Sequence, residues 1–371
     1  MRLCYLDNLR ATLVVFVISM HAADTYSPLG NWYFTDRTPL STSVLLVFAA
    51  WQMFLQAFFM GLLFFIAGLF VPDSLDRKGP RQFARERLWR LGLPVLFYML
   101  VLGPVTEYYL AHSWTSTEAT SFANEWLKHI RDGEFLQENG PLWFCLALLI
   151  FSLCYRVLRK LERPRSPRAA PGTAGLICFA LIMALATFLV RAARPPTILN
   201  MHLSDFAQYV LLFVAGILAA RQQWLAKLSL KRGIVWLTLV ATLGSAAWLA
   251  IIVAGGALEG DTGSYSGGWH WQSAALGAWE SFTCVGVSFG LLVIFRETLN
   301  YQTRLMKFAS DNAFSVYVFH PPVVIALARV LHLSPLHPLL KFVLLTLGAV
   351  FASFVLSAVI FRRIPGLRTI L

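Results

Sequence analysis

An apolar stretch near the start of the chain, LDNLRATLVVFVISMHAADTY at residues 6–26, contains two groups that can carry positive charge. Arg10 and His21 are eleven residues apart, which in an α-helix is three turns plus about 20°. Both side chains therefore lie on one face, about 16 Å apart along the axis. Ionisable groups in a membrane-spanning helix are costly and usually functional. Neutral imidazole can serve as a general base near pH 7, and the alternative is that Arg10 snorkels and His21 is a packed interfacial histidine.

Two further residues could act with His21. Asp24 follows at i+3, where it can hydrogen-bond the ring, fix its tautomer and raise its basicity. His320 lies in the apolar run 311–331 and precedes Pro321 and Pro322. We expect these prolines to break the helix, free backbone carbonyls and place His320 on a cavity wall. The alternative is a kink at which His320 bonds a nearby carbonyl.

The elements that must position these residues are membrane helices. The chain has 371 residues, of which 57% are hydrophobic and only 13% charged, whereas soluble domains carry about 25% charged residues. Ten apolar runs are long enough to span a bilayer. They lie at residues 8–24, 46–71, 90–110, 141–158, 174–191, 206–220, 233–257, 273–295, 311–331 and 339–361. We therefore predict an all-α integral membrane protein, a single domain over residues 1–371 with about ten transmembrane helices.

The distribution of charge predicts the orientation of the bundle. With the N-terminus inside, the cytoplasmic segments hold 21 Lys and Arg residues and the outside loops hold 4. This asymmetry follows the positive-inside rule and places both termini in the cytoplasm. The net charge of +12 is then mostly topology, and we expect a lipid bilayer rather than nucleic acid as the partner.

The cysteines and loops carry weaker signals. All five cysteines lie in predicted spans or on the inner side, so we expect no disulfide framework and no metal site. The Pro- and Arg-rich loop 159–173 is expected to be flexible. In the outside loop 111–140, the stretch SFANEWLKHI predicts a short helix.

An ordered set of motifs resembles the acyltransferase-3 family of membrane acyltransferases over essentially the whole chain. The set is LDNLR followed by His21, FFMGLLFFIAGLFV at 58–71, FARERLWRLGLP at 83–94, GPLWFCLALLIF at 140–151 and FSVYVFHPP at 314–322. Within the family, YLDNLR, YVFHPP and the terminal RRIPGL look most similar to the periplasmic glucan succinyltransferases.

The resemblance implies an O-acyltransferase of the bacterial inner membrane. Its donor would be a cytoplasmic acyl-CoA, best matched by succinyl-CoA and next by acetyl-CoA, and its acceptor a hydroxyl of a periplasmic glucan or another extracytoplasmic glycan. Arg87 and Arg90, at i,i+3, would bind the CoA phosphates, and Arg10 would add a contact where the donor enters. The alternative for Arg87 and Arg90 is ordinary positive-inside charge. A covalent acyl-histidine remains an alternative to general-base catalysis by His21.

Three residues are candidates for substrate contact. The Trp143 indole could donate to the oxyanion, and Glu280, inside a span, could contact substrate. Trp269 in GGWHW could stack on a sugar. The alternatives are an internal ion pair for Glu280 and the interfacial aromatic belt for Trp269.

Two other classes of protein fit some of these features. A secondary transporter or flippase would also use intramembrane His, Arg and Glu and an interrupted helix, but the chain lacks the repeated halves such proteins often show. A sensor or scaffold without chemistry predicts that His21→Ala changes only stability. The residues leave the oligomeric state open.

Overall fold

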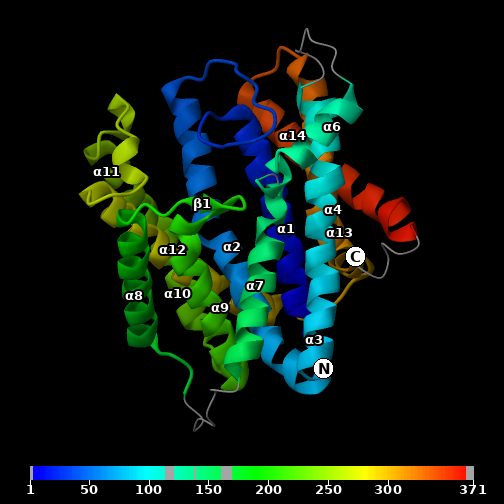
Figure 1. Cartoon of the computed structure of the whole chain (residues 1–371). Coiled ribbons are helices and arrows are strands. Elements are labelled where there is room, and N and C mark those ends of the chain that lie inside the picture. The colour runs from blue at the N-terminus through cyan, green and yellow to red at the C-terminus, as the bar shows by residue number, and fades with distance from the viewer. Residues whose placement is uncertain (1–2, 113–120, 138, 160–168, 365–371) are drawn as a thin grey trace. The chain divides into compact units, whose positions relative to one another are not determined.

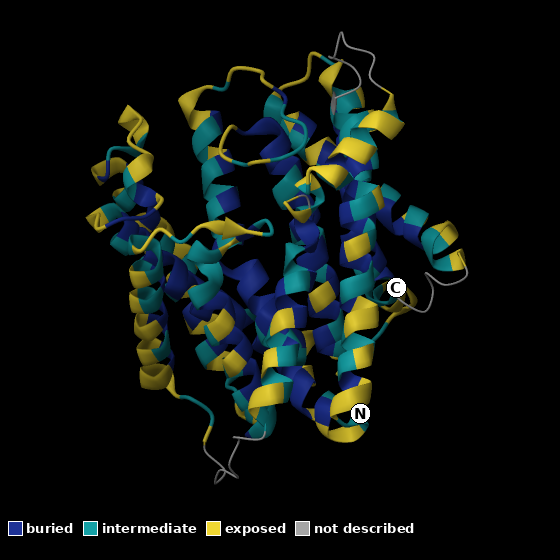
Figure 2. Cartoon of the chain, in the orientation of Figure 1, coloured by how far each residue is buried: buried dark blue, intermediate teal, exposed yellow. Residues whose placement is uncertain are grey.

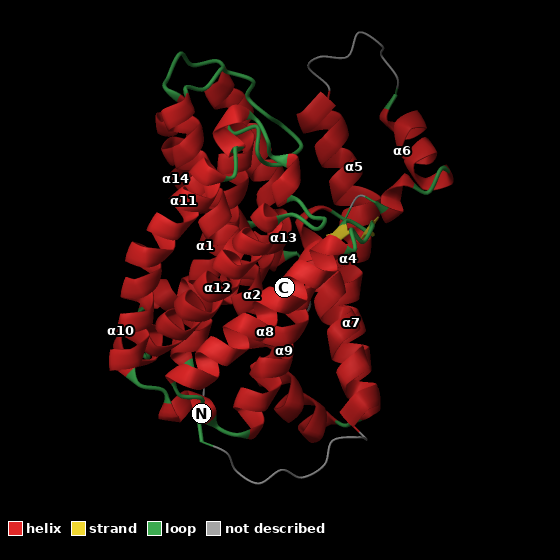
Figure 3. Cartoon of the chain, turned by 90° about the vertical axis from the view of Figure 1, so that its left-hand side faces the viewer, coloured by secondary structure: helices red, strands yellow, loops and turns green. Residues whose placement is uncertain are grey.

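The structure is a computed structural model that describes residues 3–112, 121–137, 139–159 and 169–364. Within this part of the chain ten helical segments are long and apolar enough to cross a membrane. Each of the ten predicted runs falls on one of them, which confirms the all-α multi-pass class (Figures 1 and 3). Most of the Pro- and Arg-rich loop 159–173 and the end of RRIPGL lie outside the described residues.

Fourteen α-helices and one small hairpin are described. The helices are α1 (Cys4–Tyr26), α2 (Thr42–Lys78), α3 (Pro80–Arg87), α4 (Leu93–Phe97), α5 (Gly103–Thr106), α6 (Phe122–Arg131), α7 (Trp143–Leu158), α8 (Thr173–Ala192), α9 (Phe206–Arg221), α10 (Leu230–Leu239), α11 (Ser245–Ala254), α12 (Trp271–Thr298), α13 (Arg304–His332) and α14 (Pro338–Val359). Strands β1 (Thr197–Ile198) and β2 (Met201–His202) pair antiparallel, with Thr197 opposite His202.

The chain forms two compact units. Unit 1 consists of Met1–Leu9, Gln56–Ala84 and Ile150–Gln302, and unit 2 of Arg10–Leu55, Arg85–Leu149 and Thr303–Leu371. Helices α8 to α12 belong to unit 1, and α4 to α6, α13 and α14 to unit 2. Helices α1, α2, α3 and α7 contribute residues to both.

In unit 1, glycines let helices approach closely. A Cβ at Gly68 of α2 would collide with the carbonyl oxygen of Phe213 on α9, and one at Gly216 of α9 with the carbonyl oxygen of Phe65 on α2. The two backbones therefore touch where the side chains are absent, as at small-residue interfaces of membrane helices. Neither position can hold a larger residue unless the helices move apart.

Helix α8 shows how unit 1 meets its surroundings. Its buried residues are Leu176, Ala180, Met183 and Thr187, a stripe at helical spacing on the side that packs against α12. The rest of α8 is largely exposed and apolar, including Leu185 (Figure 2). An apolar outer surface suits lipid rather than water, in agreement with the membrane class.

In unit 2, the third predicted span is not a uniform α-helix. Wider π-helical turns occupy Leu88–Gly92, Tyr98–Leu102 and Glu107–His112. Pro94 lies two residues after the end of the first turn, and Pro104 lies two residues after the end of the second. Proline lacks an N–H and cannot bond the carbonyl four residues earlier, so the regular ladder is interrupted. Such π turns are often found at functional sites.

Helix α6, which the sequence predicts, bonds to carbonyls of this span. Pro104 cannot bond the Leu100 carbonyl, and the indole N–H of Trp126 donates to that oxygen at 2.7 Å. The His129 ring nitrogen Nε2 lies 3.1 Å from the Met99 carbonyl oxygen. Two side chains of α6 thus take up backbone acceptors of the irregular span, as buried carbonyls require.

The predicted break at Pro321 and Pro322 is wrong. Helix α13 continues through both prolines from Arg304 to His332. Pro321 leaves the Tyr317 carbonyl without its helical donor, but the His320 ring nitrogen Nδ1 lies 2.8 Å from that oxygen. The side chain therefore replaces the missing backbone hydrogen bond, and the helix need not end there.

Candidate active site

The candidate site in unit 2 is built on His21, near the C-terminal end of α1. Its Nδ1 lies 3.0 Å from Oδ2 of Asp24, and the His21 side chain is 20% exposed. The other oxygen of Asp24, Oδ1, accepts a hydrogen bond of 2.6 Å from Nε2 of Gln52 on α2. A carboxylate can only accept, so it favours the tautomer with the proton on Nδ1. The lone pair of Nε2 is then available to a substrate.

The local sequence makes room for this carboxylate. A Cβ at Gly30 would overlap the side chain of Asp24, so the loop after α1 can approach only because residue 30 is glycine. The hydroxyl of Thr25 donates to the His21 carbonyl oxygen at 3.0 Å, and Asp24 is nearly buried. The orientation of the His21 ring is restricted by its contact with this buried carboxylate.

Three rings lie parallel at the site. The Trp32 ring stacks on His21 with centroids 3.9 Å apart and planes 13° apart. The His320 ring from α13 lies 5.3 Å from His21, also at 13°. Trp32 and His320 are 6.4 Å apart at 10°. The structure thus brings together His21, Asp24 and His320, the three residues that we take as catalytic candidates.

The contact between His320 and the Tyr317 carbonyl is the kink alternative considered for this histidine. It also sets the tautomer, because a carbonyl oxygen only accepts and Nδ1 must therefore carry the proton. Nε2 is then a bare acceptor. It is buried and has no hydrogen-bond partner among the described residues.

Other polar atoms around His21 share this property. The indole N–H of Trp32 and the Oε1 atom of Gln52 are buried without a partner in the described part of the chain. Buried polar groups are normally hydrogen-bonded, and exceptions often mark catalytic sites or missing ligands and water. One donor and two acceptors are therefore available beside the base.

The loop that carries Trp32 is fixed by a buried aspartate. The Oδ2 atom of Asp36 accepts from Lys341 of α14 at 3.1 Å and lies 3.3 Å from Nδ1 of His332. Burial alone would raise the pKa of Asp36, but hydrogen bonds from Thr38, Lys341 and His332 lower its pKa below the ordinary value of 3.8. The backbone N–H of Asp36 also donates to the Thr25 carbonyl at 2.7 Å.

The candidate donor residues form a group of like charges. The Arg87 guanidinium lies within electrostatic range of Arg90 and Arg10, with Glu86 as the opposing charge. Arg10 and Arg90 are exposed and Arg87 is half-buried. Since α1 is continuous, Arg10 and His21 stand on the same helix. Clustered guanidinium groups can attract an anion.

The three substrate-contact candidates are divided between the two units. Trp143 is the first residue of α7 in unit 2 and packs edge-on against Phe144. Glu280 and Trp269 belong to unit 1. Trp269 is 76% exposed and contacts Phe188 edge-on, with centroids 5.6 Å apart.

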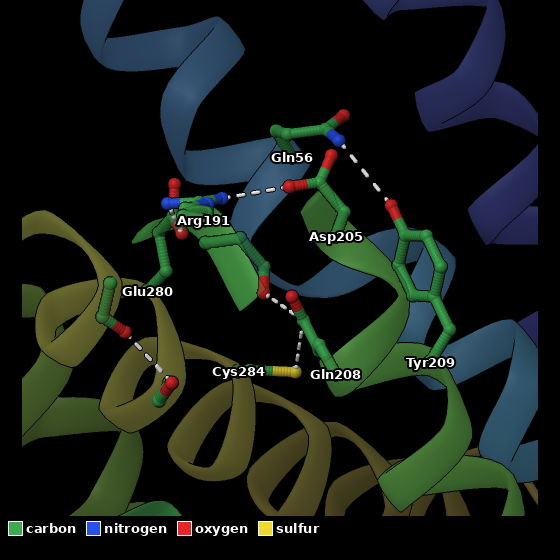
Figure 4. Close-up of polar contacts among 10 residues, drawn as sticks. Gln56, Arg191, Asp205, Gln208, Tyr209, Glu280 and Cys284 are labelled. Atoms are coloured by element: carbon green, nitrogen blue, oxygen red, sulfur yellow. Dashed lines mark hydrogen bonds and ion pairs between the residues drawn. The ribbon is translucent and has the colours of Figure 1, made fainter. Parts of the chain in front are cut away.

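Glu280 is part of an ionic cluster in the core of unit 1 (Figure 4). Arg191 of α8 lies between two carboxylates, with 2.7 Å to Glu280 and 2.8 Å to Asp205. Next to them, Nε2 of Gln208 donates to the Ala57 carbonyl at 2.6 Å and to Cys284 Sγ at 2.8 Å. The ion-pair alternative for Glu280 is therefore the contact that the structure contains.

Some residues of the site were not found from the sequence. Gln52 and the ion-pair partner Arg191 were not among the candidates, and Trp32 was considered from the sequence only as a sugar-stacking or aromatic-belt residue of an outside loop. Gln52 did offer a signal, since it is an amide within the apolar run 46–71 and polar groups inside spans mark interfaces or sites. Within the described residues, no group of three or more His, Cys, Asp and Glu side chains could hold a metal ion.

Comparison with known proteins identifies the family. The family model Acyl_transf_3, described as "Acyltransferase domain", matches residues 4–360. Searches of curated proteins and of solved structures gave no significant match. The matched span includes both units and all residues of the candidate site. The chain therefore belongs to the acyltransferase-3 family and is a membrane acyltransferase.

Proposed function

We propose that the protein transfers an acyl group from acyl-CoA to a hydroxyl of an extracytoplasmic glycan in the bacterial inner membrane, with His21 as general base. Succinyl transfer to a periplasmic glucan is the proposed reaction. The observation that carries the proposal is the chain from Gln52 through Asp24 to His21. It holds the imidazole in the tautomer whose Nε2 can take a proton.

In the proposed step, the oxygen of the glycan hydroxyl attacks the thioester carbonyl carbon while Nε2 of His21 takes up the proton of that hydroxyl. The new C–O bond forms and the C–S bond breaks. The His21 imidazolium then returns the proton to the CoA thiolate, so that ester and CoA thiol leave a neutral histidine. Asp24 stabilises the imidazolium between these events.

Trp32 is our candidate for stabilising the oxyanion. Its ring lies against His21, and its indole N–H has no partner among the described residues. A donor held in place before the reaction is the arrangement that stabilises charge developing on the carbonyl oxygen. We propose this role for Trp32 in place of Trp143, because the Trp32 ring stacks on His21.

The donor is proposed to lie along α1. Arg10, Arg87 and Arg90 would hold the CoA phosphates, which suit the fixed fork of guanidinium donors. The thin pantetheine arm would then span the distance of about 16 Å between Arg10 and His21. One helix thus marks both ends of the donor path.

The test uses purified protein in detergent, labelled succinyl-CoA or acetyl-CoA, and glycan extracted from the cell envelope. His21→Ala is expected to lower transfer by about 10²–10⁴-fold, the usual contribution of general acid–base catalysis. Binding of acyl-CoA should be retained. His337→Ala is the matched control, since it removes an exposed histidine at the start of α14 and should keep transfer.

Three outcomes decide between the alternatives. Wild-type turnover in His21→Ala would reject the general-base role. A protein that neither transfers nor hydrolyses acyl groups would favour a transporter. Mass spectrometry of enzyme quenched with donor alone detects acyl-histidine, and mass spectrometry of envelope glycans with and without the gene identifies acyl group and acceptor.

A further inference from the structure

We infer that His320 binds a second hydroxyl of the acceptor, so that the enzyme selects a diol with hydroxyls on adjacent carbons, one reacting at His21. This inference rests on the proposed function and adds to it the chemical class of the acceptor. It also gives His320 a distinct role, as a specificity-determining residue beside the base.

His21 and His320 are each held in one tautomer by a neighbouring acceptor. The Asp24 carboxylate keeps the proton of His21 on Nδ1, and the Tyr317 carbonyl keeps that of His320 on Nδ1. Both Nε2 atoms are therefore acceptors. One hydroxyl has one proton and can donate to only one of them. A ligand with two donors can fill both acceptors at once, in place of water.

The spacing of the rings suits neighbouring hydroxyls. His21 and His320 are nearly parallel, with centroids 5.3 Å apart. Two hydroxyls on adjacent ring carbons project from one edge of a small molecule, and each can donate to one imidazole. The Trp32 ring stacks on His21, so an apolar indole lies beside the imidazole that receives the reacting hydroxyl.

No described residue donates a hydrogen bond to Nε2 of His320. His320 is fully buried, and a buried acceptor without a donor is costly. Moving its proton to Nε2 would face a lone pair on Nδ1 toward the Tyr317 oxygen, whose helical donor Pro321 has removed. Among the described residues the fold therefore leaves this acceptor without a donor, and a ligand or water can satisfy it.

The ionic cluster of unit 1 does not offer a comparable site. Arg191 is bonded to Asp205 and Glu280, and Gln208 to Ala57 and Cys284. In that cluster the charged groups pair with each other, and the amide N–H group donates to a carbonyl oxygen and a sulfur atom. Around His21, the Trp32 indole N–H, Oε1 of Gln52 and Nε2 of His320 have no hydrogen-bond partner among the described residues.

The experiment compares transfer to trans-cyclohexane-1,2-diol and to cyclohexanol, which differ by one hydroxyl. We expect wild-type enzyme to prefer the diol by about ten-fold in kcat/KM beyond the statistical factor, as for one good hydrogen bond. In His320→Leu the ratio should fall to near the statistical factor. In His320→Gln part of the preference should return, because the amide oxygen also accepts. Ser357→Ala is the control, because it removes a buried hydrogen bond to Asn312 of α13, the helix that carries His320. This variant should keep the wild-type ratio.

Two results would overturn the inference. One is an equal loss with both acceptors in His320→Leu, which would make His320 structural or a ligand of a bound water only. The other is the absence of any diol preference in wild-type enzyme, measured by transfer or by thermal stabilisation without donor. Failure of the proposed function looks different, since His21→Ala would then keep transfer to both acceptors.

Discussion

The two polar clusters of the molecule, Arg191 in unit 1 and His21 in unit 2, differ in how their hydrogen bonds are used. In unit 1 the cation is matched by two carboxylates, and the amide of Gln208 by a carbonyl and a thiol. In unit 2 the groups beside His21 keep an unused donor and two unused acceptors within the described residues. Within the described residues, the hydroxyls of Thr187 and Ser273 and the Nε atom of Arg156 in unit 1 are also buried without a partner, whereas no atom of Arg191, Asp205 or Glu280 is.

The difference separates two uses of polarity inside a membrane. A cluster that satisfies itself fixes the helices that contribute to it. A cluster that leaves capacity beside a base can receive a substrate. Charge differs as well, because Arg191 is paired with Asp205 and Glu280, whereas Arg87 lies within electrostatic range of two like charges, Arg10 and Arg90. The predictions below test this division.

The largest effect is expected at Asp24. Asp24→Asn can present an N–H to Nδ1 of His21 and so favour the tautomer whose Nε2 is protonated. We expect the transfer rate to fall by about 10²–10⁴-fold, with little change in unfolding temperature. A rate within a few-fold of wild type would show that His21 does not depend on its partner.

Breaking the self-satisfied cluster should instead affect stability. Arg191→Met leaves Asp205 and Glu280 without their cation, and losing one partner of a buried ion pair costs about 3–5 kcal/mol. We expect a lower unfolding temperature and, per folded molecule, normal transfer.

Glu280→Gln tests the predicted substrate contact, since a raised acceptor KM at unchanged stability would place substrate at that residue.

Asp36 tests the anchor of the Trp32 loop through pH. Because the pKa of folded Asp36 is below 3.8, its ionised form stabilises the protein at pH values above 3.8. That contribution is lost as the pH falls through the lower folded value. We expect Asp36→Asn to be less stable at neutral pH by about 1–3 kcal/mol. Its unfolding temperature should approach that of wild type in acid, and parallel curves would contradict the assignment.

The smallest effect is expected at the donor residues. Arg87→Ala combined with Arg90→Ala should raise the KM for acyl-CoA about ten-fold, a loss of about 1.4 kcal/mol, with a smaller change in kcat. The effect should be stronger at low salt. Arg85→Ala is the control, two residues before Arg87 and off its helix face. An equal effect of Arg85→Ala would indicate general surface charge.

The sequence was sufficient for the helices and for part of the site. All ten spans follow from apolar runs, because length and composition decide whether a helix can cross a bilayer. The relation of His21 to Asp24 was predictable because helix geometry fixes neighbours at i+3. Helix α6 was predictable from its polar and aromatic composition.

The remaining partners depend on the tertiary fold. Gln52 and His320 reach His21 from other helices, and Trp32 from a loop whose path composition does not determine. The predicted break at Pro321 failed because the bond from His320 compensates for the missing N–H. The π turns of the third span gave no periodic signal.

The proline after His320 has a consequence for how this family can vary. Replacing Pro321 by alanine would give Tyr317 back a backbone donor that competes for the oxygen now held by the ring. The imidazole could then carry its hydrogen on either nitrogen, and the acceptor would no longer be guaranteed. The tautomer of His320 therefore depends on the residue at position 321. We expect relatives that lose the proline to tolerate a residue other than histidine at position 320.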